Sequence, residues 1–237
     1  MSCPMSFGEL NIPSSRAFWD DCEEDELDSN QDPEKLDLKF QEGAQETPIP
    51  SELFVLIEGP NIEGFGNAVI KEQSSRVICD IPPKKSTSKL AFNASNKQLL
   101  AVLEDELSYS GEITELLIPY AQVAKNVFTI TLKPKVEYKS EEINKYSDDI
   151  TIVRGVDANL KGVIELEAPN FIVGVTAGIA SWCKQSNHPC SSYIIYTDKL
   201  PLDEIAAQPV LKLLQKLGVP CSTSYTPPRK DDSHLYS

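Results

Sequence analysis

The sequence has few of the residues that exchange protons near neutral pH. It contains only two histidines, His188 and His234, and histidine is the side chain best suited to that task. His188 falls in a predicted surface loop, and His234 falls in a polar tail where a fixed catalytic geometry is not expected. A Gly-x-Ser-x-Gly nucleophile elbow is also missing. We therefore predict no catalytic residues, no cofactor and a chain that is not an enzyme.

Basic residues are scarce: the sequence has 22 Lys and Arg compared with 36 Asp and Glu, which gives a net charge of −14. Residues 1–50 alone hold 13 acidic and 3 basic residues, with nine acids and no base between positions 20 and 34. Such a run repels itself and has little apolar surface to bury, so it is predicted to be disordered. A phosphate backbone requires clustered Lys and Arg. The densest cluster is only Lys84, Lys85 and Lys89, so no nucleic acid is expected as a partner.

Long apolar runs are also absent. No stretch approaches the roughly 20 residues of a membrane helix, and the N-terminus turns acidic without the apolar core of a signal peptide. We therefore expect no membrane span and a cytoplasmic location, with a nuclear or endoplasmic-reticulum-associated location left open. In that reducing environment the six cysteines, at positions 3, 22, 79, 183, 190 and 221, are predicted to be thiols.

Motifs for metals and phosphates are incomplete. The residues considered for a metal are Cys183, His188, Cys190 and Cys221. They contain no Cys-x-x-Cys pair, so buried thiols are predicted and no metal. The glycine-rich residues 59–66 lack the Gly-Lys-Ser/Thr ending of a phosphate loop, and Glu63 would repel phosphate, so a turn is predicted. Asp198, directly after a predicted strand, is interpreted as a turn or cap residue.

Apolar runs and turn signals predict an α/β fold, with a layered sheet flanked by helices. The predicted domains are an acidic N-terminal segment (1–50), an α/β domain (51–221) and a flexible docking tail (222–237). Strands are predicted at 53–57, 76–81, 126–133 and 190–197, and helices at 96–107, 170–185 and 203–217. The last helix contains Pro209 and is predicted to end in a left-handed cap at Gly218. Pro119 makes residues 115–124 ambiguous, and the polar residues 137–149 are predicted to form a loop.

The tail ends in an apolar, an aromatic and a small residue, Leu235-Tyr236-Ser237. A terminal carboxylate can be bound by a lysine or by backbone N–H groups of a partner. Tyr236 adds an aromatic anchor and Leu235 an apolar contact. These three residues are therefore predicted to bind a partner.

Short motifs in chain order resemble a known family. The motifs are Phe7-Gly8-Glu9 before the acidic run, residues 126–132, Glu167-Ala168-Pro169-Asn170 before an apolar helix, Ala180-Ser181-Trp182-Cys183, Tyr196-Thr197-Asp198 and the terminal Leu235-Tyr236-Ser237. In these the sequence is similar to the proteasome assembly chaperone 1 family, in a divergent, invertebrate-like form. The resemblance is best over residues 126–237.

The resemblance implies a chaperone that promotes assembly of the α-subunit ring of the core proteasome. It also implies a heterodimer with proteasome assembly chaperone 2. The tail would insert between neighbouring α-type proteasome subunits, with the Ser237 carboxylate meeting a lysine.

Three other functions stay open on the sequence. The same C-terminus would suit a regulator that binds the proteasome gate. An α/β enzyme would place its ligand near residues 59–66 or Asp198, where open α/β sheets often bind ligands. A general adaptor would present its C-terminus to a peptide-binding domain.

Overall fold

A computed structural model describes residues 36–83, 87–140, 146, 148–158 and 160–228. The elements, in chain order, are β1 (Lys39–Phe40), β2 (Ser51–Gly59), α2 (Glu63–Glu72), β3 (Arg76–Asp80), β4 (Lys89–Asn93), β5 (Gln98–Glu104), the 3-10 turn η1 (Leu107–Tyr109), α3 (Ser110–Val123), β6 (Ala124–Pro134), the 3-10 turn η2 (Lys135–Glu137), β7 (Thr151–Val156), β8 (Ile164–Glu165), α4 (Gly174–Gln185), β9 (Cys190–Thr197) and α5 (Glu204–Lys216).

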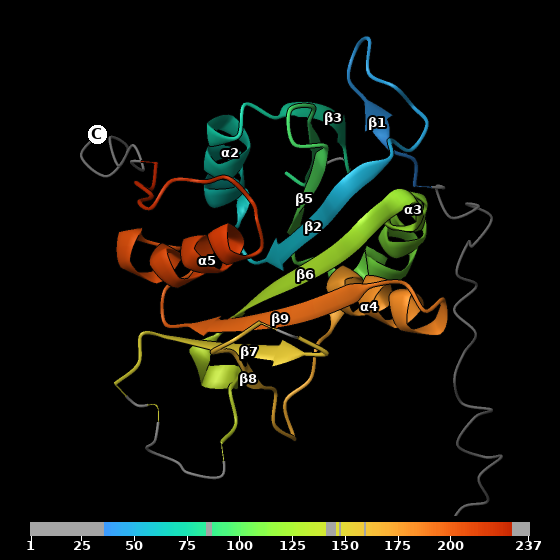
Figure 1. Cartoon of the computed structure of the whole chain (residues 1–237). Helices are drawn as coiled ribbons and strands as arrows, with labels where there is room; N and C mark the ends of the chain where they lie inside the picture. The colour runs from blue at the N-terminus through green and yellow to red at the C-terminus, as the bar shows by residue number, and fades with distance from the viewer. Residues whose placement is uncertain (1–35, 84–86, 141–145, 147, 159, 229–237) are drawn as a thin grey trace, which may run out of the picture. The chain divides into compact units, whose positions relative to one another are not determined.

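The strands form one nine-stranded sheet in the order β1-β3-β4-β5-β2-β6-β9-β7-β8 (Figure 1). The central strands β5, β2, β6 and β9 run parallel, while β4 and β7 pair antiparallel with their inner neighbours. Helices α2 and α5 cover one face of the sheet, and α3 and α4 cover the other. The predicted α/β fold with a layered sheet and flanking helices is confirmed.

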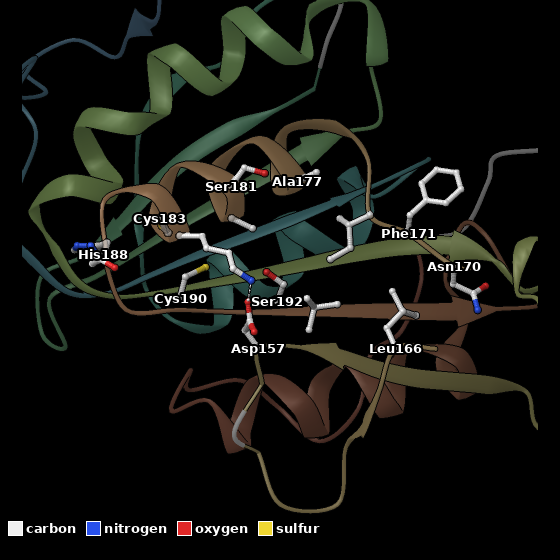
Figure 2. A pocket seen from close by; sticks show the side chains of 15 residues that line it. Asp157, Leu166, Asn170, Phe171, Ala177, Ser181, Cys183, His188, Cys190 and Ser192 are labelled. Carbon is white, nitrogen blue, oxygen red and sulfur yellow. Dashed lines mark hydrogen bonds and ion pairs between the residues drawn. The ribbon is translucent and has the colours of Figure 1, made fainter. Parts of the chain in front are cut away.

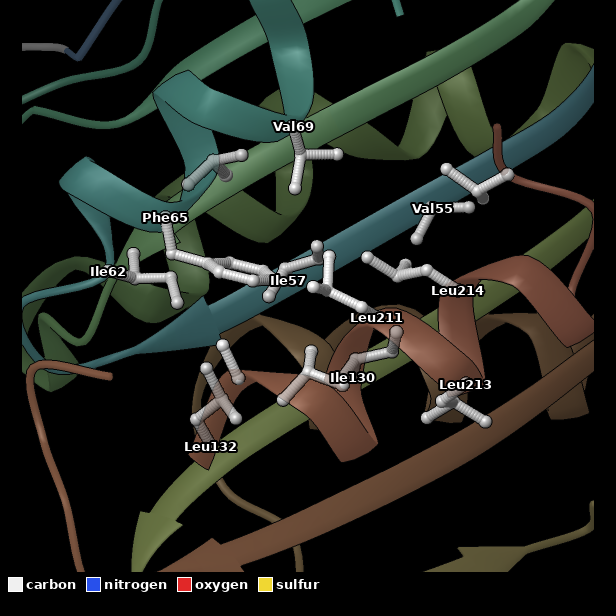
Figure 3. Close-up of a cluster of buried hydrophobic side chains, with 14 of the residues drawn as sticks. Val55, Ile57, Ile62, Phe65, Val69, Ile130, Leu132, Leu211, Leu213 and Leu214 are labelled. Carbon is white, nitrogen blue, oxygen red and sulfur yellow. The ribbon is translucent and has the colours of Figure 1, made fainter. Parts of the chain in front are cut away.

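Strand β2 shows why the sheet is covered on both faces. Its residues 53–57 are apolar without interruption, and side chains alternate between the faces of a strand. Val55 and Ile57 pack with α2 and α5 (Figure 3), whereas Phe54 and Leu56 pack with α3 and α4. The strand predicted here is confirmed, as are those at β3, β6 and β9.

Helix α5 begins and ends where the sequence predicts. The Asp203 carboxylate accepts hydrogen bonds from the N–H groups of Ile205 (3.1 Å) and Ala206 (2.8 Å), which would otherwise lack partners in the first helical turn. Pro209 lies inside the helix. Gly218 follows it with φ of +85°, so the predicted left-handed cap is confirmed.

Residues 96–107 were predicted to be a helix, and that prediction is wrong. Residues 98–104 form strand β5, which pairs with β2 on one side and β4 on the other. In a run this apolar, a helical stripe and a strand buried on both faces produce the same pattern. Leu107, the last residue of the predicted helix, lies outside β5 and is 58% exposed.

The glycine-rich residues 59–66 were predicted to form a turn. Residues 60 and 61 do form a turn, and helix α2 begins after it, at Glu63. Gly66 serves close packing rather than a turn. A Cβ at Gly66 would lie 2.3 Å from Cγ1 of Val102, so the absent side chain lets α2 approach β5.

Several other elements extend or shift the predictions. The ambiguous residues 115–124 belong mostly to α3, and α4 begins at Gly174 rather than at residue 170. Strands β4, β7 and β8 were not predicted. Strand β1 pairs with β3, so the sheet includes residues before position 51. Of the predicted loop 137–149, residues 141–145 and 147 lie outside the described residues.

A buried carboxylate joins the centre of the sheet to α4. Glu58, 2% exposed near the end of β2, accepts hydrogen bonds from the N–H groups of Val175 (2.9 Å) and Thr176 (2.8 Å) and from the Thr176 hydroxyl (2.7 Å). These N–H groups lie in the first turn of the helix, where they have no partner within the helix. Burial raises the pKa of Glu58 above its ordinary value, although the hydrogen bonds from Thr176 and Val175 oppose that rise.

Replacing Gly174 should disrupt this contact. Gly174 has φ of +81°, and a Cβ there would lie 2.3 Å from Oε1 of Glu58. We expect Gly174→Ala to lower the free energy of unfolding by about 2–4 kcal/mol, because it adds left-handed strain and separates Glu58 from its donors. Denaturant titration followed by circular dichroism measures the change.

The matched control is Gly111→Ala in α3, where a Cβ would meet no atom within 4 Å. That variant should be neutral or stabilising by up to about 1 kcal/mol. Equal stabilities of the two variants would contradict this account of Gly174.

Candidate functional site

The predicted partner-binding residues Leu235, Tyr236 and Ser237 lie outside the described residues. The segment that leads to them is described as far as residue 228. It begins after α5 and runs over α2, on the face of the sheet opposite α4 (Figure 1). The structure therefore describes the chain up to Pro228, and six residues separate it from the predicted docking residues.

Tyr225 anchors this segment. Its side chain is 6% exposed, and its ring meets that of Phe65 edge-on at 5.4 Å between centroids. Burial raises the pKa of the Tyr225 hydroxyl. The Ser222 N–H donates a hydrogen bond of 2.7 Å to Oε2 of Glu72 at the end of α2. An aromatic contact and a charge-assisted hydrogen bond thus hold the segment on α2.

The anchor sets the reach of the tail. Nine residues follow Pro228 in the sequence, and an extended chain spans at most about 3.3–3.6 Å per residue. Ser237 therefore lies within about 30 Å of Pro228. A partner that binds the last three residues must come within that distance of Pro228.

The ends of the parallel strands near this anchor are acidic. Glu63, Glu104 and Glu106 line a cavity of about 450 Å³, which Tyr225 and Pro228 also line; we call it the tail cavity. The Asn61 N–H, which a phosphate loop would direct at its ligand, instead donates to Oε1 of Glu104 at 2.5 Å. Carboxylates repel phosphate, so the arrangement does not favour a nucleotide here.

The other sequence candidates have structural roles. Oδ2 of Asp198 accepts a hydrogen bond of 3.2 Å from Nζ of Lys135, at the turn that follows β9. The His188 N–H donates to the carbonyl of Cys183 at 2.8 Å, and its ring lies 5.9 Å from that of Trp182. Nε2 of His188 is buried and has no hydrogen-bond partner among the described groups.

The cysteines do not gather into a metal site in the described part of the chain. Four of them are described as free thiols: Cys79, Cys183, Cys190 and Cys221. Among residues 36–228, leaving aside the gaps, no three His, Cys, Asp or Glu side chains lie together as ligands for a metal ion. Nor is any helix in these ranges both long and apolar enough to cross a bilayer.

A groove between α4 and the strands β7 and β9 was not predicted from the sequence (Figure 2). It has a volume of about 590 Å³, and we call it the α4 groove. Residues that line it include Asp157, Phe171, Ala177, Cys183, Lys184 and Cys190. Nζ of Lys184 pairs with Oδ2 of Asp157 at 3.1 Å, and Phe171 is 63% exposed. A mostly apolar lining with a few polar groups is typical of a site that binds another molecule.

The Glu167-Ala168-Pro169-Asn170 motif fastens the loops beside this groove. The Asn170 side chain donates to the carbonyl of Lys139 (2.7 Å) and accepts from its N–H (2.9 Å). Glu167 accepts hydrogen bonds from Arg154, at 3.0 Å, and from the Tyr138 hydroxyl. The motif therefore holds the segment before α4 against the residues that follow η2.

Arg154 is the centre of that cluster. It is 3% exposed, lies 5.2 Å from the ring centre of Tyr138 and 4.8 Å from that of Tyr146, and pairs with Glu167. Burial and the Glu167 carboxylate raise the pKa of Tyr138 to about 12. Burial alone would raise the pKa of Glu167, but hydrogen bonds from Tyr138 and Arg154 hold it below its ordinary value. The buried charge is thus paired and hydrogen-bonded, as a buried guanidinium requires.

Removing the Tyr225 ring should free the segment that leads to the tail. We expect Tyr225→Ala to increase amide hydrogen exchange of residues 222–228 by at least about tenfold, because losing about 1.4 kcal/mol of local stability changes an opening equilibrium by that factor. Tyr225→Phe retains the ring contact with Phe65 and should exchange as the unchanged chain does. Equal protection of this segment in all three proteins would refute the anchor.

No protein-family model matches the sequence, and no curated protein matches it. Solved structures share its fold. Pyrococcus furiosus PbaA, an archaeal homolog of proteasome-assembly chaperone, is 18% identical, with a TM-score of 0.55 over 80% of this chain and 84% of that one. Pyrococcus furiosus PbaB, an archaeal proteasome activator, is 14% identical, with a TM-score of 0.54 over 80% of this chain and 91% of that one. A Thermoplasma acidophilum protein of unknown function is 16% identical, with a TM-score of 0.54 over 73% of this chain and 77% of that one. At these identities the likeness establishes a shared fold.

Proposed function

We propose that this chain is a non-enzymatic chaperone that promotes assembly of the α-subunit ring of the core proteasome. The observation that carries the proposal is the likeness of fold to PbaA over 80% of this chain. The motifs in residues 126–237 that resemble proteasome assembly chaperone 1 support it independently. The carboxylates of the tail cavity also favour binding over chemistry on a phosphate substrate.

The proposed docking residues are Leu235, Tyr236 and Ser237, with the terminal carboxylate meeting a lysine between two α-type subunits. Three anchoring residues bind weakly alone, because they lose conformational freedom on binding. Attachment at Tyr225 leaves the six residues 229–234 as a tether between the described segment and the proposed docking residues. If the domain contacts the ring as well, such a tether raises the overall affinity by about 10²–10⁴ over either contact alone.

The proposed partner in assembly of the α-subunit ring is proteasome assembly chaperone 2, a second α/β chain. The resemblance implies it, and exposed apolar side chains give it a surface to bind. These side chains lie in elements at the β7–β8 end of the sheet: Val136 (90% exposed), Ile164 (59%) and Phe171 (63%). The tail segment packs on α2, which lies against β5. Three strands separate β5 from β7 in the sheet, so this end stays available to the second chain.

A gate-binding regulator is the second candidate, and one observation favours it. The fold is as similar to PbaB, an archaeal proteasome activator, as to PbaA. An activator binds mature core particles and speeds peptide hydrolysis, whereas an assembly chaperone binds immature particles that contain the α ring. The two functions therefore differ in the particle that is recovered.

The deciding experiment is affinity purification of the tagged chain from cells, with particles separated by size and identified by mass spectrometry. We expect α-type subunits in immature particles, together with a second α/β chaperone. Removing Leu235-Tyr236-Ser237 should reduce recovery of α-type subunits at least tenfold, the effect of losing about 1.4 kcal/mol of binding free energy. If only mature particles are recovered and peptide hydrolysis is faster, the assembly chaperone is rejected and the gate-binding regulator is supported.

Matched variants separate the tail from the domain. Tyr236→Ala should weaken recovery nearly as much as the truncation, while His234→Ala, two residues away, should not. Recovery of the second chaperone should survive both changes, because its proposed surface lies at the β7–β8 end of the sheet. Absence of proteasome subunits from every sample would reject both functions.

A further inference from the structure

Two cysteines from different elements meet at one end of the α4 groove (Figure 2). Cys183 lies in the last turn of α4, and Cys190 is the first residue of β9. Cys183 is fully buried in the core between α4 and the sheet, and Cys190 packs against that core while remaining partly exposed. One thiol of the pair is therefore accessible from the groove, and the other lies behind it.

Backbone contacts hold the two residues at this position. The His188 N–H bonds to the Cys183 carbonyl at 2.8 Å, and the Val127 N–H bonds to the Pro189 carbonyl at 3.0 Å. These bonds fix both ends of the short connection between α4 and β9. The neighbourhood of the two thiols is thus set by secondary structure and does not depend on a loose loop.

Each of the two thiols also shifts the pKa of the other. The neighbouring Cys190 thiol, together with burial, raises the pKa of Cys183. The neighbouring Cys183 thiol lowers the pKa of Cys190, against the opposing effect of burial. The accessible sulfur is therefore the one that more readily becomes a thiolate, which is the reactive form.

We infer that Cys183 and Cys190 form a redox-responsive pair, which closes into a disulfide when the surrounding pool of low-molecular-weight thiols becomes oxidised. Both cysteines line one end of the α4 groove. Forming or breaking the disulfide therefore changes the surface that this end of the groove presents to a partner. The inference concerns the purified chain and does not depend on the proposed role in proteasome assembly.

The oxidant is a small disulfide such as oxidised glutathione. The Cys190 thiolate attacks one of its sulfur atoms, forming a mixed disulfide and releasing one glutathione thiolate. The Cys183 sulfur then attacks the Cys190 sulfur, giving up its proton to the second departing glutathione. Two protein thiols are oxidised to one disulfide, and one glutathione disulfide is reduced to two thiols.

The other described cysteines lack these features. Cys79 is fully buried, and burial raises its pKa to about 12. Burial raises the pKa of Cys221 to about 11, and its sulfur lies 3.6 Å from the carbonyl of Leu211. Among the described groups, no second cysteine contributes to the pKa shift of either thiol, so both serve as matched controls.

The test equilibrates the full-length chain in glutathione buffers of increasing oxidation, blocks free thiols and digests the chain with trypsin. Cleavage after Lys161, Lys184 and Lys199 places Cys183 in residues 162–184 and Cys190 in residues 185–199. We expect these two peptides to become disulfide-linked in most chains, and the link to vanish on return to reduced glutathione. The Cys79→Ser and Cys221→Ser variants should form the same link at the same ratio of oxidised to reduced glutathione.

Single substitutions distinguish a pair from two independent thiols. Cys183→Ala should leave Cys190 carrying glutathione, because no second thiol resolves the mixed disulfide. Cys190→Ser should leave Cys183 unmodified, because it is buried. The inference is overturned if the unchanged chain accumulates glutathione on Cys190 without the linked peptides, or if no link forms at any ratio.

Discussion

The described domain depends on a charge placed inside its core. Glu58, near the end of the central strand β2, accepts hydrogen bonds from the N–H groups of Val175 and Thr176. These bonds hold the first turn of α4 in position. The positive end of a helix dipole favours a carboxylate there. The Thr176 hydroxyl also lies 2.7 Å from that of Thr131, which extends the link to β6. Burial disfavours the ionised form of Glu58 and raises its pKa, so burying this carboxylate without hydrogen-bond donors would cost free energy. A different position of α4 would remove these donors.

The position of α4 then decides what the rest of the surface presents. Gly178 lets α4 approach α3, since a Cβ there would lie 2.5 Å from Oγ1 of Thr114. On the side away from α3, α4 borders the α4 groove, and Cys183 is one of the residues that line this groove. The tail anchor at Phe65 and Tyr225 belongs to the core on the other face of the sheet. The α4 groove and the tail anchor therefore lie on opposite faces of the sheet.

The sequence predicted those elements whose pattern has one structural solution. Residues 190–197 and 126–133 are rich in β-branched and aromatic residues next to turn signals, and both are strands. Residues 98–104 were misassigned because an all-apolar run suits a helix or a buried strand equally, and only pairing with β2 and β4 decides. The α4 groove and the Cys183–Cys190 contact arise from elements that meet only in the fold, so spacing along the chain did not predict them. The docking tail stays a prediction, because residues 235–237 lie outside the described part of the chain.

The tail cavity lies where α/β sheets commonly bind ligands. Open α/β sheets bind ligands at the carboxyl ends of their parallel strands, which here are Gly59 of β2 and Glu104 of β5, paired in register. Glu104 accepts the hydrogen bond of the Asn61 N–H, which a bound phosphate would otherwise accept. Glu63 and Glu106 add negative charge to the same cavity. Tyr225 and Pro228 line the same cavity. The place where an α/β enzyme would hold its substrate is thus where this chain packs residues 225–228.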